Sequence, residues 1–259
     1  MRQLFLALTM LCLAGTAEAA IKTRTIEYKQ GGTVLEGFLA WNDATNAKRP
    51  GILVIHEWTG INANIKKHTE MLARLGYVAF AADIYGKGIR PAAPADAARI
   101  AAIYKNDRSL MRARARAGLA ELKKQKLVDP RRLAAIGFCF GGTAALELAR
   151  SGADLKGVVS FHGGLSTPTP QDARNIKGKV LALQGADDPF VKADEVAAFE
   201  DEMRKGGVDW QLNIYSNAVH GFTNPSNGSD NSKGAAYNKQ ADQRSWEAMK
   251  AFFAEIFTK

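Results

Sequence analysis

The sequence is poor in cysteine, which limits how the folded chain can be stabilised. It contains two cysteines in 259 residues, Cys12 and Cys139. Cys12 lies in an apolar N-terminal run, so removal of that run would leave one thiol and no internal disulfide. Because oxidising compartments normally pair cysteines, a single remaining thiol is either a buried, inert side chain or a reactive one.

Long hydrophobic runs are also missing. The apolar run LFLALTMLCLAG after Arg2 is too short to span a bilayer core of about 30 Å comfortably, and no later run is long enough. Ala17-Glu18-Ala19 then supplies the small-x-small pattern of a cleavage site. We therefore expect residues 1–19 to be a cleaved signal peptide, with export to the bacterial periplasm or secretion and no stable membrane insertion. The alternatives are an uncleaved membrane anchor or a lipidated Cys12, although Thr9-Met10-Leu11 does not resemble a lipobox.

No internal repeat, low-complexity tract or linker divides residues 20–259, so we expect them to form a single domain. Lys and Arg outnumber Asp and Glu by 35 to 26, giving a net charge of +9. The densest basic cluster contains Arg108, Arg112, Arg114 and Arg116. Within it, Arg108, Arg112 and Arg116 have the i, i+4 spacing of one helix face, which we interpret as solvated. No aromatic residues interleave with these charges, so we expect no nucleic-acid partner.

The rest of the sequence alternates between short apolar runs and amphipathic stretches. Two strands around Gly31-Gly32 are followed by buried strands predicted at 51–57, 77–83, 132–138, 156–162, 179–185 and 210–216. Helices are predicted at 64–76, 94–105, 108–126, 143–150, 193–207 and 239–257. This alternation indicates an α/β protein with a mostly parallel central sheet and helices on both faces. In such sheets, chemistry collects at the carboxyl ends of the strands.

The clearest local motif is Gly137-Phe138-Cys139-Phe140-Gly141-Gly142, between a predicted strand and a predicted helix. It matches the G-x-S-x-G nucleophile elbow, with cysteine in place of serine and small residues beside a sharp turn. The helix N-terminus would favour a thiolate on Cys139 and offer the Phe140 N–H to an oxyanion. We interpret Cys139 as a nucleophile, and the alternative is a tight turn with an inert cysteine.

An elbow of this kind predicts an acid after a later strand and a histidine after the last strand. Strand 179–185 runs into Asp187 and Asp188, and strand 210–216 is followed by His220. His220 would take the thiol proton and give it to the leaving group, while the acid holds its tautomer. We prefer Asp188 because it precedes a proline as in G-x-x-D-P, which leaves Asp187 as a turn residue.

Four segments together resemble the dienelactone hydrolase family over nearly all of the chain after the predicted signal peptide. They are His56-Glu57-Trp58-Thr59-Gly60, Asp83-Ile84-Tyr85, the elbow around Cys139, and the Asp188/His220 pair. The resemblance implies an α/β-hydrolase fold and an enzyme that cleaves a small-molecule ester or lactone through an acyl-thioenzyme. It also implies that Glu57 contacts the cysteine in the resting enzyme, that the Trp58 N–H is the second oxyanion donor, and that Tyr85 lines the substrate site.

Two positions depart from the family pattern. Family enzymes that open dienelactone hold its carboxylate with arginines, one shortly after D-x-Y and one four residues beyond the catalytic histidine. This chain has Lys87 at the first position, with Arg90 nearby, and Asn224 at the second. Lysine lacks the bidentate fork of arginine, and asparagine has no charge. With Lys87 and Asn224 at the substrate site, neutral esters and lactones are the expected substrates.

The remaining histidines are interpreted as structural. His56 neighbours Glu57, His68 lies in the middle of a predicted helix, and His162 precedes two glycines at a strand end. No His, Cys and Asp cluster has the spacing of zinc ligands, so we expect no metal and no cofactor. Two other hypotheses stay open: a non-catalytic binding protein on a hydrolase scaffold, and a peptidase or acyltransferase on the same fold.

Overall fold

The computed structural model describes residues 20–258, which are built around one eight-stranded sheet with the order β1-β2-β4-β3-β5-β6-β7-β8. The strands are β1 (Ile21–Gln30), β2 (Thr33–Asn42), β3 (Arg49–Ile55), β4 (Val78–Ala82), β5 (Val128–Phe138), β6 (Gly157–Phe161), β7 (Lys179–Gly185) and β8 (Trp210–Tyr215). β1 and β2 form an antiparallel hairpin, β2 pairs antiparallel with β4, and β3 to β8 run parallel. The mostly parallel sheet predicted from the sequence is therefore confirmed.

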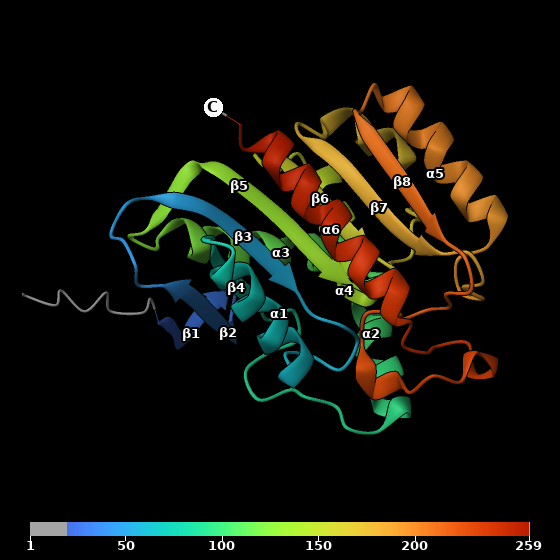
Figure 1. The fold of residues 1–259 in the computed structure, drawn as a ribbon, viewed down its shortest axis with the longest axis horizontal. Helices are drawn as coiled ribbons and strands as arrows, with labels where there is room; N and C mark the ends of the chain where they lie inside the picture. Colours follow the sequence, from blue (N-terminus) through green and yellow to red (C-terminus); the bar gives the residue numbers. More distant parts are fainter. Residues whose placement is uncertain (1–19, 259) are drawn as a thin grey trace, which may run out of the picture.

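Helices cover both faces of the sheet. They are α1 (Ala63–Arg74), α2 (Pro94–Asn106), α3 (Arg108–Lys123), α4 (Phe140–Arg150), α5 (Ala193–Gly206) and α6 (Lys239–Ile256). α1 and α6 contribute Leu72 and Phe253 to an apolar cluster on one face, in front of the sheet in Figure 1. α3 and α5 contribute Met111 and Phe199 to the cluster on the other face. Because both faces are covered, the central strands are apolar along almost their whole length.

Three short 3-10 helices lie in segments where the sequence predicted no element. They are η1 (Pro170–Asn175), η2 (Pro225–Asn227) and η3 (Asn231–Lys233). The Asn224 and Asp230 side chains accept the N–H groups that open η2 and η3. Such short turns carry too few residues to show a hydrophobic period, so only their capping residues could have predicted them.

The predicted solvated basic face on α3 holds at Arg116, which is exposed, but is wrong at Arg112. Arg114, which belongs to the basic cluster but not to that face, is buried and donates to Oγ1 of Thr33 (2.8 Å). Arg112 pairs with Glu147 of α4 (2.7 Å) and with Asp172 of η1 (2.6 Å). Helical spacing correctly placed these arginines on a helix, but it could not show that two other elements bring carboxylates to that helix.

The parallel strands point their carboxyl ends toward one edge of the sheet, as the arrowheads in Figure 1 show. Loops leaving β3, β5, β7 and β8 at this edge carry Glu57, Cys139, Asp188 and His220. Within residues 20–258, no helix combines the length and apolar character needed to cross a membrane. Residues 1–19, where the signal peptide is predicted, lie outside the described residues.

Candidate active site

Cys139 occupies the sharp turn between β5 and α4. Its backbone has φ 55° and ψ −117°, a conformation that costs a residue with a side chain on the order of 1–3 kcal/mol. The thiol is free and partly exposed. The turn lifts this side chain above the end of the sheet, as a nucleophile elbow requires.

Glycines surround the turn because backbone segments meet there. A Cβ on Gly137 would overlap the carbonyl of Gly141, and a Cβ on Gly141 would overlap the carbonyl of Ile55. A Cβ on Gly142 would come within 2.9 Å of the Cα of Gly163. The start of α4 therefore packs directly on β3 and on the loop after β6, which fixes the nucleophile relative to both.

Three predicted catalytic side chains form a continuous series of hydrogen bonds. His220 Nε2 lies 3.0 Å from Cys139 Sγ, and His220 Nδ1 lies 2.8 Å from Asp188 Oδ2. The other oxygen of the buried Asp188 accepts the N–H of Phe190 (2.8 Å). Asp187 is exposed. The geometry therefore favours Asp188 as the partner of His220.

The charge on His220 follows from its two partners. Burial alone would lower the pKa of the imidazole, but the negative charges of Cys139 and Asp188 outweigh burial and raise the pKa to about 10. At neutral pH the ring is therefore an imidazolium, placed to stabilise a thiolate. Backbone hydrogen bonds join His220 to Gly234 (3.2 Å) and Ala236 (3.1 Å), which hold its loop in place.

Two backbone N–H groups remain available for an oxyanion. Phe140 is the first residue of α4, and Trp58 lies in the loop after β3. Across residues 20–258, neither N–H is paired with an acceptor. The hydroxyl of Tyr85 donates to the Trp58 carbonyl (2.9 Å). Burial, followed by the nearby charge of Cys139, raises the pKa of Tyr85, so this buried hydroxyl stays protonated and supports the Trp58 segment.

His56 also holds the loop after β3 in place. Its Nδ1 donates to the Glu57 carbonyl (2.6 Å), and its Nε2 accepts the N–H of Ile84 (3.1 Å). Burial lowers the pKa of His56 to about 4, so the ring is neutral and both nitrogens fit one tautomer. His56 therefore ties the loop after β3 to the loop after β4, consistent with its interpretation as a hydrogen-bonding neighbour of Glu57.

Glu57 has different partners from those that the family resemblance implies. Its carboxylate accepts hydrogen bonds from Asn224 (3.0 and 3.2 Å) and from Asn62 (3.4 Å). Cys139 Sγ instead faces His220. Burial raises the pKa of Glu57, although the amide hydrogen bonds oppose this effect. The carboxylate is thus held beside the site by amides rather than by the thiol.

The Asn224 side chain donates to the Glu57 carboxylate, whereas the sequence predicted that it would contact the substrate. Its side chain is buried, and its Oδ1 accepts the N–H of Ser226 at the start of η2 (3.0 Å). That bond turns the amide nitrogen toward Glu57. At this position Glu57 therefore has a neutral amide as its partner and no cationic side chain.

Lys87, which the sequence placed at the substrate, and the nearby Arg90 both have carboxylate partners. Lys87 pairs with Glu27 of β1, and its side chain is half exposed. Arg90 lies 3.7 Å from Asp83 and 3.9 Å from Glu36. Both cations therefore already have carboxylate neighbours within the protein before any substrate binds.

His162, interpreted from the sequence as structural, lies beside the triad. Its Nδ1 accepts the N–H of Cys139 (3.1 Å), and its Nε2 lies 2.8 Å from Thr223 Oγ1. Its ring is edge-on to that of His220, with centroids 5.3 Å apart. The sequence could not predict these contacts, because His162, Cys139 and Thr223 lie far apart in the chain. The one available clue was the position of His162 at the carboxyl end of a strand.

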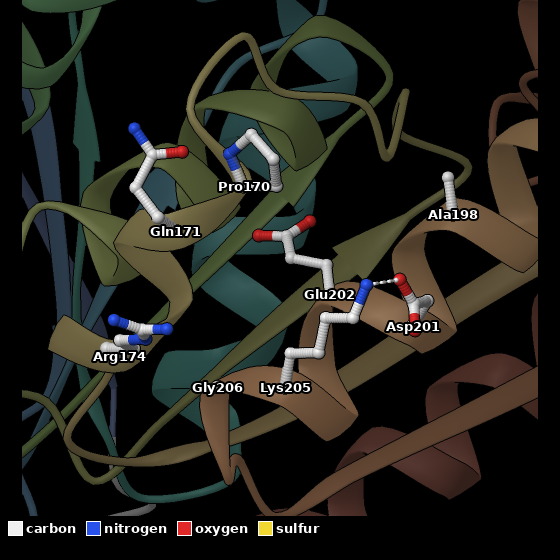
Figure 2. A pocket seen from close by; sticks show the side chains of 8 residues that line it. All are labelled: Pro170, Gln171, Arg174, Ala198, Asp201, Glu202, Lys205 and Gly206. Carbon is white, nitrogen blue, oxygen red and sulfur yellow. Dashed lines mark ion pairs between the residues drawn. The ribbon is translucent and has the colours of Figure 1, made fainter.

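A hollow of about 340 Å³ lies between η1 and α5 and contains none of these residues (Figure 2). Arg174, Lys205, Asp201 and Glu202 are among the side chains that line it. Lys205 pairs with Asp201, and Glu202 pairs with the buried Arg150. Lys205, Asp201 and Glu202 are thus paired within the protein, and the predicted catalytic residues lie elsewhere.

The arrangement around Cys139 is suited to nucleophilic acyl transfer. It brings together a thiol, an imidazolium oriented by a buried carboxylate, and two unpaired N–H groups. In the part of the chain from 20 to 258, no three His, Cys, Asp or Glu side chains are grouped to hold a metal ion.

Comparison with known proteins identifies one family. The dienelactone hydrolase family matches residues 35–257. Protein usf from Aquifex pyrophilus is 32% identical over 241 residues, which cover 90% of this chain and 98% of that protein. The family match therefore extends from within β2 to the end of α6 and includes every loop that carries a predicted catalytic residue.

Two solved structures are similar at higher identity. The structure named m3DLH is 44% identical, with a TM-score of 0.89, and the match covers 92% of this chain and 100% of that chain. A dienelactone hydrolase-like promiscuous phosphotriesterase from metagenomic libraries is 41% identical, with a TM-score of 0.87 and the same coverage, 92% and 100%. Both share the mostly parallel sheet with this chain.

Proposed function

The chain belongs to the dienelactone hydrolase family, and from this premise we propose that it hydrolyses neutral esters and lactones through an acyl-thioenzyme on Cys139. Family membership makes it an ester or lactone hydrolase rather than a non-catalytic binding protein. One observation carries the proposed mechanism: Cys139 Sγ and Asp188 Oδ2 lie 3.0 and 2.8 Å from the two nitrogens of the same imidazole, that of His220.

In the first half of the reaction, the Cys139 thiolate attacks the ester carbonyl carbon and forms a C–S bond. The carbonyl electron pair moves to oxygen, which the N–H groups of Phe140 and Trp58 would bind. Collapse of this intermediate breaks the C–O bond, and the departing alkoxide takes the proton from His220 Nε2. For a lactone, the alcohol stays attached to the acyl group.

In the second half, the neutral His220 takes a proton from water as the water attacks the thioester carbonyl. The C–S bond breaks, the acid leaves, and the thiolate is restored beside the imidazolium. Asp188 keeps the Nδ1 proton in place throughout, so that Nε2 always faces the reacting atoms. No cofactor takes part in either half of this scheme.

Neutral esters and lactones should be hydrolysed with a kcat/KM at least about tenfold higher than carboxylate-bearing analogues of similar size. An anion next to Cys139 needs cationic partners, and Lys87 and Arg90 are already paired with carboxylates. The measurement is a screen of p-nitrophenyl esters and of matched neutral and anionic lactones, dienelactone included, at low and high salt.

Asn224→Arg provides the test of this explanation. The guanidinium would neutralise the Glu57 carboxylate, so preference should shift toward the anionic lactone by about tenfold. Asn224→Gln keeps a neutral amide and is the matched control. An unmodified enzyme that prefers dienelactone over the neutral lactone by about tenfold would show that another cation serves the substrate.

Phosphotriester hydrolysis is a second candidate function. The relative from metagenomic libraries that is 41% identical is named a promiscuous phosphotriesterase. A phosphotriester is uncharged, which suits a site whose neighbouring cations are already compensated. The same screen therefore includes a dialkyl p-nitrophenyl phosphate, and release of p-nitrophenol no faster than in buffer would remove this candidate.

We also propose that the enzyme works outside the cytoplasm, on the basis of the predicted signal peptide at residues 1–19. Expressed in full length in a Gram-negative host, the protein should be recovered from the periplasm or the medium with Ala20 as its first residue. The control is a variant that carries Arg at positions 17 and 19, which should block cleavage. Recovery of the unmodified protein from the cytoplasm with residues 1–19 intact would contradict export.

A further inference from the structure

His162 joins two segments that carry reacting groups. It follows β6, whereas Cys139 follows β5 and His220 follows β8. Its Nδ1 accepts the Cys139 N–H at 3.1 Å, and its Nε2 lies 2.8 Å from Oγ1 of Thr223, three residues after His220. The side chain is fully buried. One imidazole ring therefore spans the distance between the nucleophile and the loop of the base.

The hydrogen bonds fix the protonation state of this ring. The Cys139 N–H can only donate, so Nδ1 must accept, and Nε2 carries the proton and donates to Thr223. Burial, followed by the positive charge of His220, lowers the pKa of His162 well below its usual value. His162 thus stays neutral while His220 is an imidazolium, and it does not compete for the catalytic proton.

The backbone shows that this placement has a cost. His162 has φ 41°, in the left-handed region that residues with side chains rarely adopt. A Cβ on the next residue, Gly163, would lie only 2.8 Å from the Cα of Gly142, so the loop after β6 packs directly against the first turn of α4. This backbone contact brings the His162 ring within reach of the Cys139 amide.

The Cys139 N–H does not need His162 to be satisfied. It also donates to the carbonyl of Phe161 at 2.9 Å, as expected for a strand end. What His162 adds is the second bond, to Thr223, which connects the elbow with the loop of the base. The link between the loops of Cys139 and Thr223 therefore explains why His162 is buried in a strained backbone conformation.

We propose that His162 is a positioning residue, which with Thr223 sets the separation of Cys139 Sγ and His220 Nε2. The inference rests on the proposed function, since it concerns the geometry of that acyl transfer. It predicts a defect in the chemical step and little change in substrate binding, because His162 is buried behind the reacting atoms.

The test compares His162→Phe, which keeps an aromatic ring without its hydrogen bonds, with Thr223→Val, which removes only the far acceptor. With p-nitrophenyl butyrate, kcat should fall about 10- to 100-fold in the first and about 3- to 10-fold in the second, with KM within about twofold. The rate at which iodoacetamide alkylates Cys139 should fall in parallel. The double variant should be no slower than His162→Phe, because both residues act through one hydrogen bond.

His68→Phe is the matched control. His68 is also a buried histidine packed on an aromatic ring, that of Phe138 (centroids 4.5 Å apart), but its hydrogen bond goes to Asn64 in its own helix. The kcat of His68→Phe should stay within about twofold of that of the unmodified enzyme.

Several results would overturn the inference. They are an undiminished kcat in Thr223→Val and His162→Phe, a loss that resides wholly in KM, or an equal loss in His68→Phe. If His162→Phe does not fold, the nearly isosteric Thr223→Val decides the question alone. Full activity in Cys139→Ala would contradict the proposed function itself, whereas an inactive Cys139→Ala beside a fully active Thr223→Val and His162→Phe would overturn the positioning role only.

Discussion

Cys139→Ala should lower kcat/KM for p-nitrophenyl esters by about 10⁴-fold or more, because removal of a nucleophile abolishes the covalent route and leaves only the oxyanion donors and binding. The side chain is partly exposed and its hydrogen bond to His220 joins two reacting groups, so little packing is lost. The melting temperature should therefore change by no more than about 4 °C. The measurement is steady-state hydrolysis beside thermal unfolding.

Chemical labelling gives an independent control for Cys139. In the folded enzyme produced without residues 1–19, iodoacetamide should add one label, at Cys139, with loss of activity in step. His220→Ala should slow the labelling, since the imidazolium no longer stabilises the thiolate. Undiminished turnover in Cys139→Ala, or a thiol that reacts only after denaturation, would place the chemistry elsewhere.

The elbow and its two partners could be predicted because each is encoded locally. The glycines at 137, 141 and 142 report close backbone contacts that a larger residue would prevent, so a short motif implies a three-dimensional turn. Strand and helix periods then place the segments of Asp188 and His220 at the same edge of a parallel sheet. Chain order and sheet topology together bring three distant residues to one site.

The partners of polar side chains could not be predicted in the same way. Nothing near Asn224 in the sequence indicates that its amide faces Glu57, because the two residues lie 167 positions apart in the chain. His162 was interpreted as structural for a similar reason, since its two partners come from different loops. Local patterns determine where an element begins and which face is apolar, while hydrogen-bond partners depend on how distant loops meet.

Asp188→Asn should lower kcat by about 10³- to 10⁴-fold, whereas Asp187→Asn should leave it within about twofold. Both substitutions replace a carboxylate by an amide of the same shape at adjacent positions. In Asp188→Asn, the amide oxygen keeps the Phe190 N–H, and the amide nitrogen then faces His220 Nδ1. A donor facing Nδ1 forces that nitrogen to accept, so the ring proton moves to Nε2 and His220 can no longer take the thiol proton.

The melting temperatures of the same two variants should also depend differently on pH. A histidine whose pKa rises on folding contributes stability that is complete below its unfolded value of about 6.5 and is lost as the pH rises through about 10. Asp188→Asn removes part of that rise, so its deficit in melting temperature should be largest near pH 7 and shrink toward pH 10. Asp187→Asn should show no such trend, because its exposed carboxylate has no contact with the ring. Equal losses of activity in the two variants, or a deficit that grows toward pH 10, would rule out Asp188 as the residue that orients His220.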